Sequence, residues 1–224
     1  MNLFDILGPV MVGPSSSHTA GAVRIGRMAR RLLGEDTPEL AQIMLSGSFA
    51  ATGRGHGTDR AIIAGLLGMN TDDERIPISF DEAKACGMGF SFSSVNLSGE
   101  HPNTAKIILT GRSGKTLEMI ASSLGGGRIQ VVEMNGLRVS FSGDLPTLIV
   151  QNRDQPGHVR DVTSILALSS VNIATLHLYR DYPGGSAVMI IETDKTVSEE
   201  SLRLIRSIPG ISGVIFVGAE KERA

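Results

Sequence analysis

The stretch TLIVQNRDQPGHVRDVTSILALSSVNIATLHLYRD, residues 147–181, decides the fold of the second half of the chain. It opens on a short apolar segment rich in β-branched residues, continues with apolar side chains at helical spacing, and ends on a second apolar segment. The same strand–helix–strand pattern then repeats from the third strand onward, at 186–218. The predicted order is strand, helix, strand, strand, helix, strand, at 147–152, 158–170, 171–181, 186–194, 198–208 and 211–218.

A βαββαβ order predicts an antiparallel sheet with both helices on one face, which is the ferredoxin-like arrangement. Leu145-Pro146 precedes this self-contained pattern and marks the expected domain boundary. We therefore expect a first domain at 1–145 and a second at 146–224, and an α+β fold class for the chain.

The first domain reads as a mixed α/β unit. Asn135-Gly136 stands between two alternating segments and predicts a type I′ hairpin turn. The expected elements are helices at 17–33, 58–67 and 79–87, strands at 39–49, 104–110 and 128–143, and a loop at 47–57.

Composition excludes several classes of protein. The 224 residues carry a formal net charge of −2 and only 4% aromatic residues, so no nucleic-acid-binding surface is expected. No apolar run reaches the about 18 residues of a membrane span, and the N-terminus lacks a signal-peptide pattern. We therefore expect a cytoplasmic protein. Cys86 is the single cysteine, so no metal site held by this chain alone is expected.

The first chemistry-bearing motif is GPSSSHT, residues 13–19. Three hydroxyl groups and an imidazole come directly before a predicted helix, whose first N–H groups attract an anion such as a carboxylate or phosphate. The alternative is that Ser17 or Thr19 simply caps the helix and the other serines are solvated. One local cap does not account for three hydroxyl groups and a histidine.

The second motif is GRGHGTD, residues 53–59. His56 lies between two glycines, where a ligand can approach the backbone closely, and imidazole suits proton transfer near neutral pH. The alternative is a surface turn with a solvated histidine. Neither this motif nor Gly114-Lys115-Thr116 fits a nucleotide-binding loop, because Thr58 and Leu109 stand where such loops need glycine.

The third motif is NRDQPGH, residues 152–158, at the entry to the first helix of the second domain. Asp154 is expected to cap that helix, and Pro156-Gly157 fit a helix entry. An amino-acid ligand is compatible with the same turn, with Asp154 or Asn152 contacting its ammonium group and backbone N–H groups contacting its carboxylate.

GPSSSHT (13–19) and TGRGHGTD (52–59), followed by a βαββαβ unit, resemble the beta chain of bacterial iron–sulfur-dependent L-serine dehydratase, also called L-serine ammonia-lyase. The resemblance covers essentially the whole chain. The first domain is also similar to the allosteric-substrate-binding domain of some phosphoglycerate dehydrogenases, and the second resembles an ACT domain.

The resemblance implies conversion of L-serine to pyruvate and ammonia together with an alpha chain, which supplies the ligands of a 4Fe-4S cluster. It implies that His56 is the proton-abstracting base and that His18 contacts substrate or supports proton transfer. The hydroxyl groups expected to bind the substrate carboxylate belong to Ser15, Ser16, Ser17 and Thr19. Asp59 is expected to orient His56.

For the second domain, the resemblance implies amino-acid sensing and self-association through the ACT domain. The expected effector-binding residues are Asn152, Asp154, Gly157, His158 and Asn172. The main rival interpretation is a regulatory subunit of another metabolic enzyme that senses an amino acid and has no catalytic residue. A regulatory piece of a dehydrogenase and a self-sufficient hydrolase are weaker rivals, because the chain has neither a nucleotide-binding motif nor a G-x-S-x-G elbow.

Overall fold

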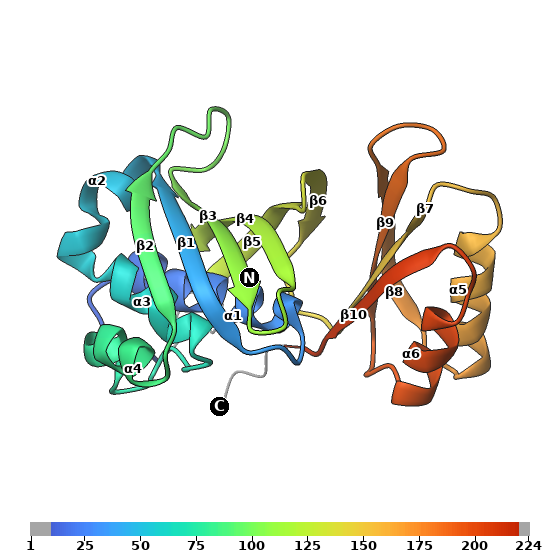
Figure 1. Ribbon diagram of the computed structural model, residues 1–224, viewed down its shortest axis with the longest axis horizontal. Helices are drawn as coiled ribbons and strands as arrows, with labels where there is room; N and C mark the ends of the chain where they lie inside the picture. The colour runs from blue at the N-terminus through green and yellow to red at the C-terminus, as the bar shows by residue number, and fades with distance from the viewer. Residues whose placement is uncertain (1–9, 220–224) are drawn as a thin grey trace. The chain divides into compact units, whose positions relative to one another are not determined.

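The second half of the chain contains the predicted elements in the predicted order (Figure 1). The computed structural model describes residues 10–219, without the side chain of Arg54. The elements of this half are β7 (Thr147–Arg153), α5 (His158–Leu168), β8 (Ile173–Arg180), β9 (Ser186–Thr193), α6 (Glu199–Arg206) and β10 (Ile211–Val217). The α+β class is confirmed.

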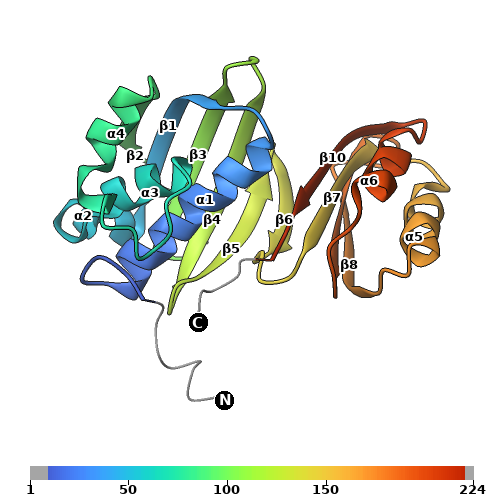
Figure 2. The ribbon, with the colours of Figure 1, turned by 90° about the horizontal axis from the view of Figure 1, so that it is seen from below.

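The four strands of this half form an antiparallel sheet in the order β10-β7-β9-β8, and α5 and α6 cover one of its faces (Figures 1 and 2). Leu148, Val150, Met189 and Ile191 are fully buried in the core shared with the helices. Ser198 caps α6, because its side chain accepts a hydrogen bond from the N–H of Ser201. Strand β8 forms one edge of the sheet.

The first half of the chain is built on a second sheet, with the strand order β2-β1-β3-β4-β5-β6. Strand β2 runs parallel to β1, whereas the pairs β1–β3, β3–β4 and β4–β5 are antiparallel. The strands are β1 (Pro38–Ser46), β2 (Gly89–Ser94), β3 (Asn103–Gly111), β4 (Thr116–Gly125), β5 (Arg128–Met134) and β6 (Leu137–Phe141).

The turn between β5 and β6 is the predicted Asn135-Gly136 turn. Both residues have positive φ, 49° and 79°, as a type I′ turn requires. The chain divides into two compact units in this turn, at 1–136 and 137–224. The boundary expected at Leu145-Pro146 stays a prediction.

Helices lie on one face of the first sheet (Figure 2). They are the π-helical turn η2 (Ser16–Ala20), α1 (Gly21–Leu33), α2 (Gly47–His56), α3 (Thr58–Leu66), the 3-10 turn η3 (Ile76–Ile78) and α4 (Ser79–Ala85). Helices α1 and α3 touch backbone to backbone: a Cβ atom on Gly26 would lie 2.2 Å from the carbonyl oxygen of Ile62, and one on Gly65 would lie 2.1 Å from that of Val23. None of the described helices is long and apolar enough to cross a membrane.

The expected loop at 47–57 is wrong, because these residues form α2 and the turn after it. The carbonyl oxygen of Pro102 accepts the N–H groups of Ser48 and Phe49, at 2.7 and 3.4 Å, and so satisfies the start of the helix. Phe49 is fully buried and anchors it. Strands β2 and β4 were not predicted, and the expected helix at 17–33 begins as the π-helical turn η2.

Candidate active site

The first motif folds into η2, and Ser15 fixes its start. The side chain of Ser15 accepts a hydrogen bond from the N–H of His18 at 3.1 Å, and its carbonyl oxygen accepts the N–H of Thr19 at 2.8 Å. Ser15 is therefore the cap, rather than Ser17 or Thr19. The carbonyl oxygen of Ser17 accepts a hydrogen bond of 3.0 Å from the hydroxyl group of Ser123 on β4, which holds η2 against the sheet.

The imidazole of His18 lies among hydroxyl groups from two elements. Its Nε2 lies 3.2 Å from Ser48 Oγ and 3.2 Å from Thr52 Oγ1, both on α2. Its Nδ1 lies 3.4 Å from Ser15 Oγ, and its ring meets that of Phe49 edge-on. Burial lowers the pKa of His18 below 6.5, and the nearby His56 lowers the pKa further. The His18 ring is therefore neutral at neutral pH.

His56, from the second motif, lies beside His18 at the C-terminal end of α2. The centroids of the two rings are 4.8 Å apart. The Nδ1 atom of His56 lies 3.1 Å from the carbonyl oxygen of Thr52. A carbonyl oxygen can only accept, so this hydrogen bond places a proton on Nδ1 and the lone pair of the neutral ring on Nε2. His56 is exposed, so Nε2 is available to a substrate.

The backbone ties the two motifs together. Thr19 is buried, and its hydroxyl group donates to the carbonyl oxygen of His56 at 3.3 Å. Gly57 turns the chain between α2 and α3 with a φ of 70°, in the left-handed region that favours glycine. The structure thus brings Ser15–Thr19 and His56 to one place, although α1 and β1 separate them in the sequence.

Thr58 and Asp59 start α3, and no side chain caps this helix. The Oδ1 atom of Asp59 accepts the N–H of Arg60 at 2.8 Å, whereas His56 Nδ1 donates to the carbonyl oxygen of Thr52. Thr58 is fully buried, and its Oγ1 has no hydrogen-bond partner among the described residues. The role of Asp59 in orienting His56 stays a prediction.

Sequence reasoning missed the residues that complete this site from other elements. Three of them lie outside both motifs, and Thr52 begins the second motif without any sign in the sequence that it contacts His18. A turn of three glycines, Gly125–Gly127, joins β4 to β5 with φ values of 91°, 59° and 77° beside Ser17. The missed side chains are those of Ser48, Phe49, Thr52 and Ser123.

The described residues do not fit an iron–sulfur cluster. Among them there is no group of three or more His, Cys, Asp and Glu side chains that could hold a metal ion. Cys86, directly after α4, is exposed, and its thiol donates to the carbonyl oxygen of Ala83. The described residues therefore do not offer a complete set of cluster ligands.

Comparison with known proteins identifies the family. The serine dehydratase beta chain family matches residues 2–88, which include both motifs. The chain is 43% identical over 210 residues to the probable L-serine dehydratase beta chain of Bacillus subtilis, covering 94% of each protein. The chain belongs to the serine dehydratase beta chain family.

Two further relatives extend the comparison. This family member is 39% identical to the L-serine dehydratase beta chain of Peptoniphilus asaccharolyticus over 88% of each chain. It is also 32% identical over 111 residues to the D-3-phosphoglycerate dehydrogenase of Methanocaldococcus jannaschii, covering 50% of this chain and 21% of that enzyme. The similarity of the first domain to some phosphoglycerate dehydrogenases stays a prediction.

In this member of the serine dehydratase beta chain family, the side chain of Asp154 does not form the expected cap of α5. Its Oδ2 accepts hydrogen bonds of 3.0 Å from Arg180 Nη1 and from the N–H of Gly184. Both hydrogen bonds lower the pKa of Asp154, and the bond from Gly184 lowers it more than the bond from Arg180. Gly157, with a φ of 106°, takes the cap position of α5 instead. Asp154 thus fastens the β7–α5 turn to the turn between β8 and β9.

Two other residues of the third motif are buried without complete hydrogen bonding. Asn152 is 5% exposed and His158 is 7% exposed. Neither Asn152 Oδ1 nor His158 Nε2 has a hydrogen-bond partner among the described residues. The structure therefore places two unsatisfied polar atoms on either side of the turn at 153–157.

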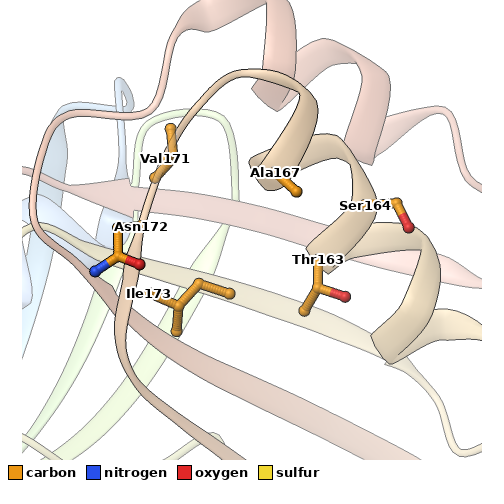
Figure 3. A pocket seen from close by; sticks show the side chains of 6 residues that line it. All are labelled: Thr163, Ser164, Ala167, Val171, Asn172 and Ile173. Carbon is orange, nitrogen blue, oxygen red and sulfur yellow. The ribbon is translucent and has the colours of Figure 1, made fainter.

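Asn172 lies elsewhere in the second unit. Its Nδ2 donates to Asp194 Oδ2 at 2.6 Å, at the start of β8, whereas Asp154 contacts the end of that strand. A hollow of about 420 Å³ next to Asn172 is lined also by residues of α5 and the segment after it, namely Thr163, Ser164, Ala167, Val171 and Ile173 (Figure 3). One chain therefore does not bring Asn172 together with Asp154.

Proposed function

We propose that this chain supplies the proton-abstracting base of an L-serine dehydratase that converts L-serine to pyruvate and ammonia together with an alpha chain. The names of the two beta-chain relatives support this activity. The observation that carries the proposal is the pair of imidazoles 4.8 Å apart, with the Nε2 lone pair of His56 open to a ligand beside the hydroxyl groups of η2.

In the proposed reaction, His56 Nε2 accepts the proton from Cα of serine. The electron pair of the broken C–H bond forms the Cα–Cβ double bond as the bond from Cβ to the hydroxyl group breaks. The leaving hydroxide and the proton that His56 releases again together give water. The resulting aminoacrylate tautomerises to an imine, and hydrolysis of the imine gives pyruvate and ammonia. His18, with its lowered pKa, stays neutral and does not repel the proton arriving on His56.

The hydroxyl groups of Ser15, Ser16 and Ser17 are proposed to position the substrate carboxylate, whereas the buried hydroxyl group of Thr19, expected to do the same, already donates its proton to the carbonyl oxygen of His56. We also propose that the 4Fe-4S cluster implied by the family resemblance is bound by the alpha chain, because this chain has a single cysteine. The catalytic unit is then the complex of the two chains.

The test is an anaerobic affinity purification of this chain from extract of its source cells, with the eluate assayed for pyruvate formed from L-serine. Co-elution of an iron-containing, cysteine-rich partner with activity supports the dehydratase. Binding of amino acids by this chain, with no partner and no turnover, would instead support the sensing subunit without catalytic residues.

A second proposed function is amino-acid sensing by the second unit, as in an ACT domain. The unpartnered atoms of Asn152 and His158 favour this proposal, because a bound amino acid offers donors to both. Asn172 is proposed to come from a second copy of the chain: antiparallel pairing of two β8 edges places the start of one strand beside the end of the other. Isothermal titration of the full chain with L-serine tests it, and absence of binding to the dimer contradicts it.

A further inference from the structure

Arg24 on α1 is a buried charged residue that the proposed reaction does not yet use. It is 8% exposed, and its Nη1 donates a hydrogen bond of 3.0 Å to the carbonyl oxygen of Gly127. Removing a guanidinium group from water costs free energy that its contacts must offset. The fold therefore places a buried charge at the end of the Gly125–Gly127 turn.

Arg24 lies on the same face of the helical segment as two residues that precede it. Ser17, Gly21 and Arg24 recur at the spacing of one helix face. The carbonyl oxygen of Ser17 accepts the hydroxyl group of Ser123 on β4, and a Cβ atom on Gly21 would lie 2.0 Å from the same hydroxyl oxygen. This face of η2 and α1 therefore packs along the end of β4 and, through Arg24, along the turn that follows.

The Gly125–Gly127 turn borders the hydroxyl group of Ser17. A Cβ atom on Gly125 would lie 3.5 Å from Ser17 Oγ, whereas one on Gly126 would have no neighbour within 4 Å. The φ values of 91°, 59° and 77° place all three glycines in the left-handed region, where a side chain strains the backbone. The turn thus approaches Ser17 with bare backbone and leaves the hydroxyl group open to a ligand.

The turn and Ser17 are held by separate hydrogen bonds. Ser123, before the turn, fixes η2 through the carbonyl oxygen of Ser17, and Arg24 fixes the far end of the turn through Gly127. A run of glycines has more conformational freedom than other residues, so its position depends on such contacts. The hydrogen bond of Arg24 therefore determines where the turn lies relative to Ser17.

We propose that Arg24 is a positioning residue for binding of the substrate carboxylate, an inference that rests on the proposed function. Its hydrogen bond keeps the Gly125–Gly127 turn beside Ser17, so that the hydroxyl group of Ser17 keeps the orientation in which it donates to the carboxylate. Its positive charge is buried, so it attracts the carboxylate more strongly than a solvated arginine does. The ammonium group of the substrate gains from neither effect.

The experiment uses the complex with the alpha chain and the variants Arg24→Met and Arg24→Lys. It measures KM and kcat for L-serine. Isothermal titration, which needs no turnover, gives the Kd of 3-hydroxypropionate, which is serine without its amino group, and of ethanolamine, which is serine without its carboxylate.

In Arg24→Met, KM and the Kd of 3-hydroxypropionate are expected to rise roughly 10-fold to 100-fold, the range for a hydrogen bond to a charged group. The kcat value and the Kd of ethanolamine should stay unchanged, because the chemical step and the ammonium group do not depend on Arg24. Arg24→Lys keeps the charge and a donor, so its values should lie between those of the wild type and Arg24→Met.

Arg30→Met is the matched control, because Arg30 also lies on α1 and donates to a glycine carbonyl oxygen, that of Gly34 at 2.8 Å, but at the other end of the helix. It should leave all four values unchanged. If Arg24→Met does not assemble, Gly125→Ala decides the question: it strains the turn beside Ser17, keeps Arg24, and should weaken binding of 3-hydroxypropionate alone.

Equal weakening of both compounds, unchanged Kd values, or the same loss in Arg30→Met would overturn the proposal. Turnover by the wild-type complex tests the proposed function separately.

Discussion

The two motif histidines lie side by side but in different surroundings. His18 is half-buried, with hydroxyl groups at both ring nitrogens, whereas His56 is exposed and bound through one nitrogen to the carbonyl oxygen of Thr52. A neutral, enclosed ring is suited to orienting a ligand, and an open lone pair is suited to taking a proton. The surroundings thus favour His56 over His18 as the proposed base.

Replacing His56 by Gln is expected to leave the complex with the alpha chain assembled and to lower kcat for L-serine by about 100-fold or more, the usual contribution of general base catalysis. Steady-state kinetics and size-exclusion chromatography measure the two effects. The matched control is Lys84→Gln, since Lys84 is also an exposed side chain near the end of a helix of the first unit but lies on α4. Substantial activity in His56→Gln with the same pyruvate yield per serine would remove His56 from the role of base.

The pKa of His18 predicts a pH-dependent stability. Because the folded-state pKa lies below 6.5, the unfolded chain binds a proton between these two values that the folded chain does not. The free energy of unfolding should therefore be highest above about pH 6.5, fall as the pH drops toward the folded-state pKa, and level off below it. Urea unfolding of the wild type and of His18→Asn from pH 8 to pH 5 measures this. Both ends of this range lie at least about one unit from the ordinary histidine pKa.

His18→Asn removes the titrating group and is therefore the control for the wild type. The wild type should lose stability relative to His18→Asn as the pH falls. Parallel curves across the whole range would show that His18 has the same pKa in both states.

At the scale of elements, long periodic segments could be predicted from the sequence, and segments defined by tertiary contacts could not. The βαββαβ unit was predicted because each element carries its own apolar period. Because of its glycines, the segment GRGHGTD indicated a loop in place of α2. This helix is stabilised by Phe49 and by the carbonyl oxygen of Pro102. The GFSFSS segment of β2 is too short and polar to indicate a strand without β1 beside it.

The candidate site divides in the same way. Its histidines and serines lie in two local motifs and could be predicted. Ser48 and Ser123 could not, because helix packing brings Ser48 to His18 and the sheet brings Ser123 to Ser17. Gly114-Lys115-Thr116, which does not fit a nucleotide-binding loop, has a structural role, because Lys115 Nζ donates to the carbonyl oxygen of Leu33 at the end of α1.

The crossing of α1 and α3 predicts a sharp difference between two glycine substitutions. Gly65→Ala places a Cβ atom 2.1 Å from the carbonyl oxygen of Val23, so it should lower the free energy of unfolding by about 1–3 kcal/mol. Gly55→Ala is the matched control, because Gly55 is also helical and a Cβ atom there has no neighbour within 4 Å. It should leave stability unchanged or raise it by up to about 1 kcal/mol. Chemical denaturation compares them, and equal effects would contradict the tight crossing.

At the scale of the whole molecule, the edge strand β8 is the surface through which self-association is proposed. Leu178 on this strand is 44% exposed. An arginine there should prevent strand pairing, because a charged side chain on an edge strand disfavours added strands. We expect Leu178→Arg to sediment as a single copy at concentrations at which the wild type is a dimer.

The control for this prediction is Leu204→Arg on α6, where the leucine is 51% exposed and lies in the helical layer. This variant should keep the oligomeric state of the wild type. Loss of association in both variants, or in neither, would exclude β8 as the contact between copies.

The glycine crossing of α1 and α3 also determines how the chain tolerates changes of length. The motif bearing His18 leads into α1, and the motif bearing His56 leads into α3. The contact between Gly26 and Gly65 therefore sets the distance between the two imidazoles. The number of residues between the motifs then matters little. An insertion in the turn between α1 and β1 leaves the contact between α1 and α3 unaltered, whereas a single methyl group at the crossing shifts both histidines at once.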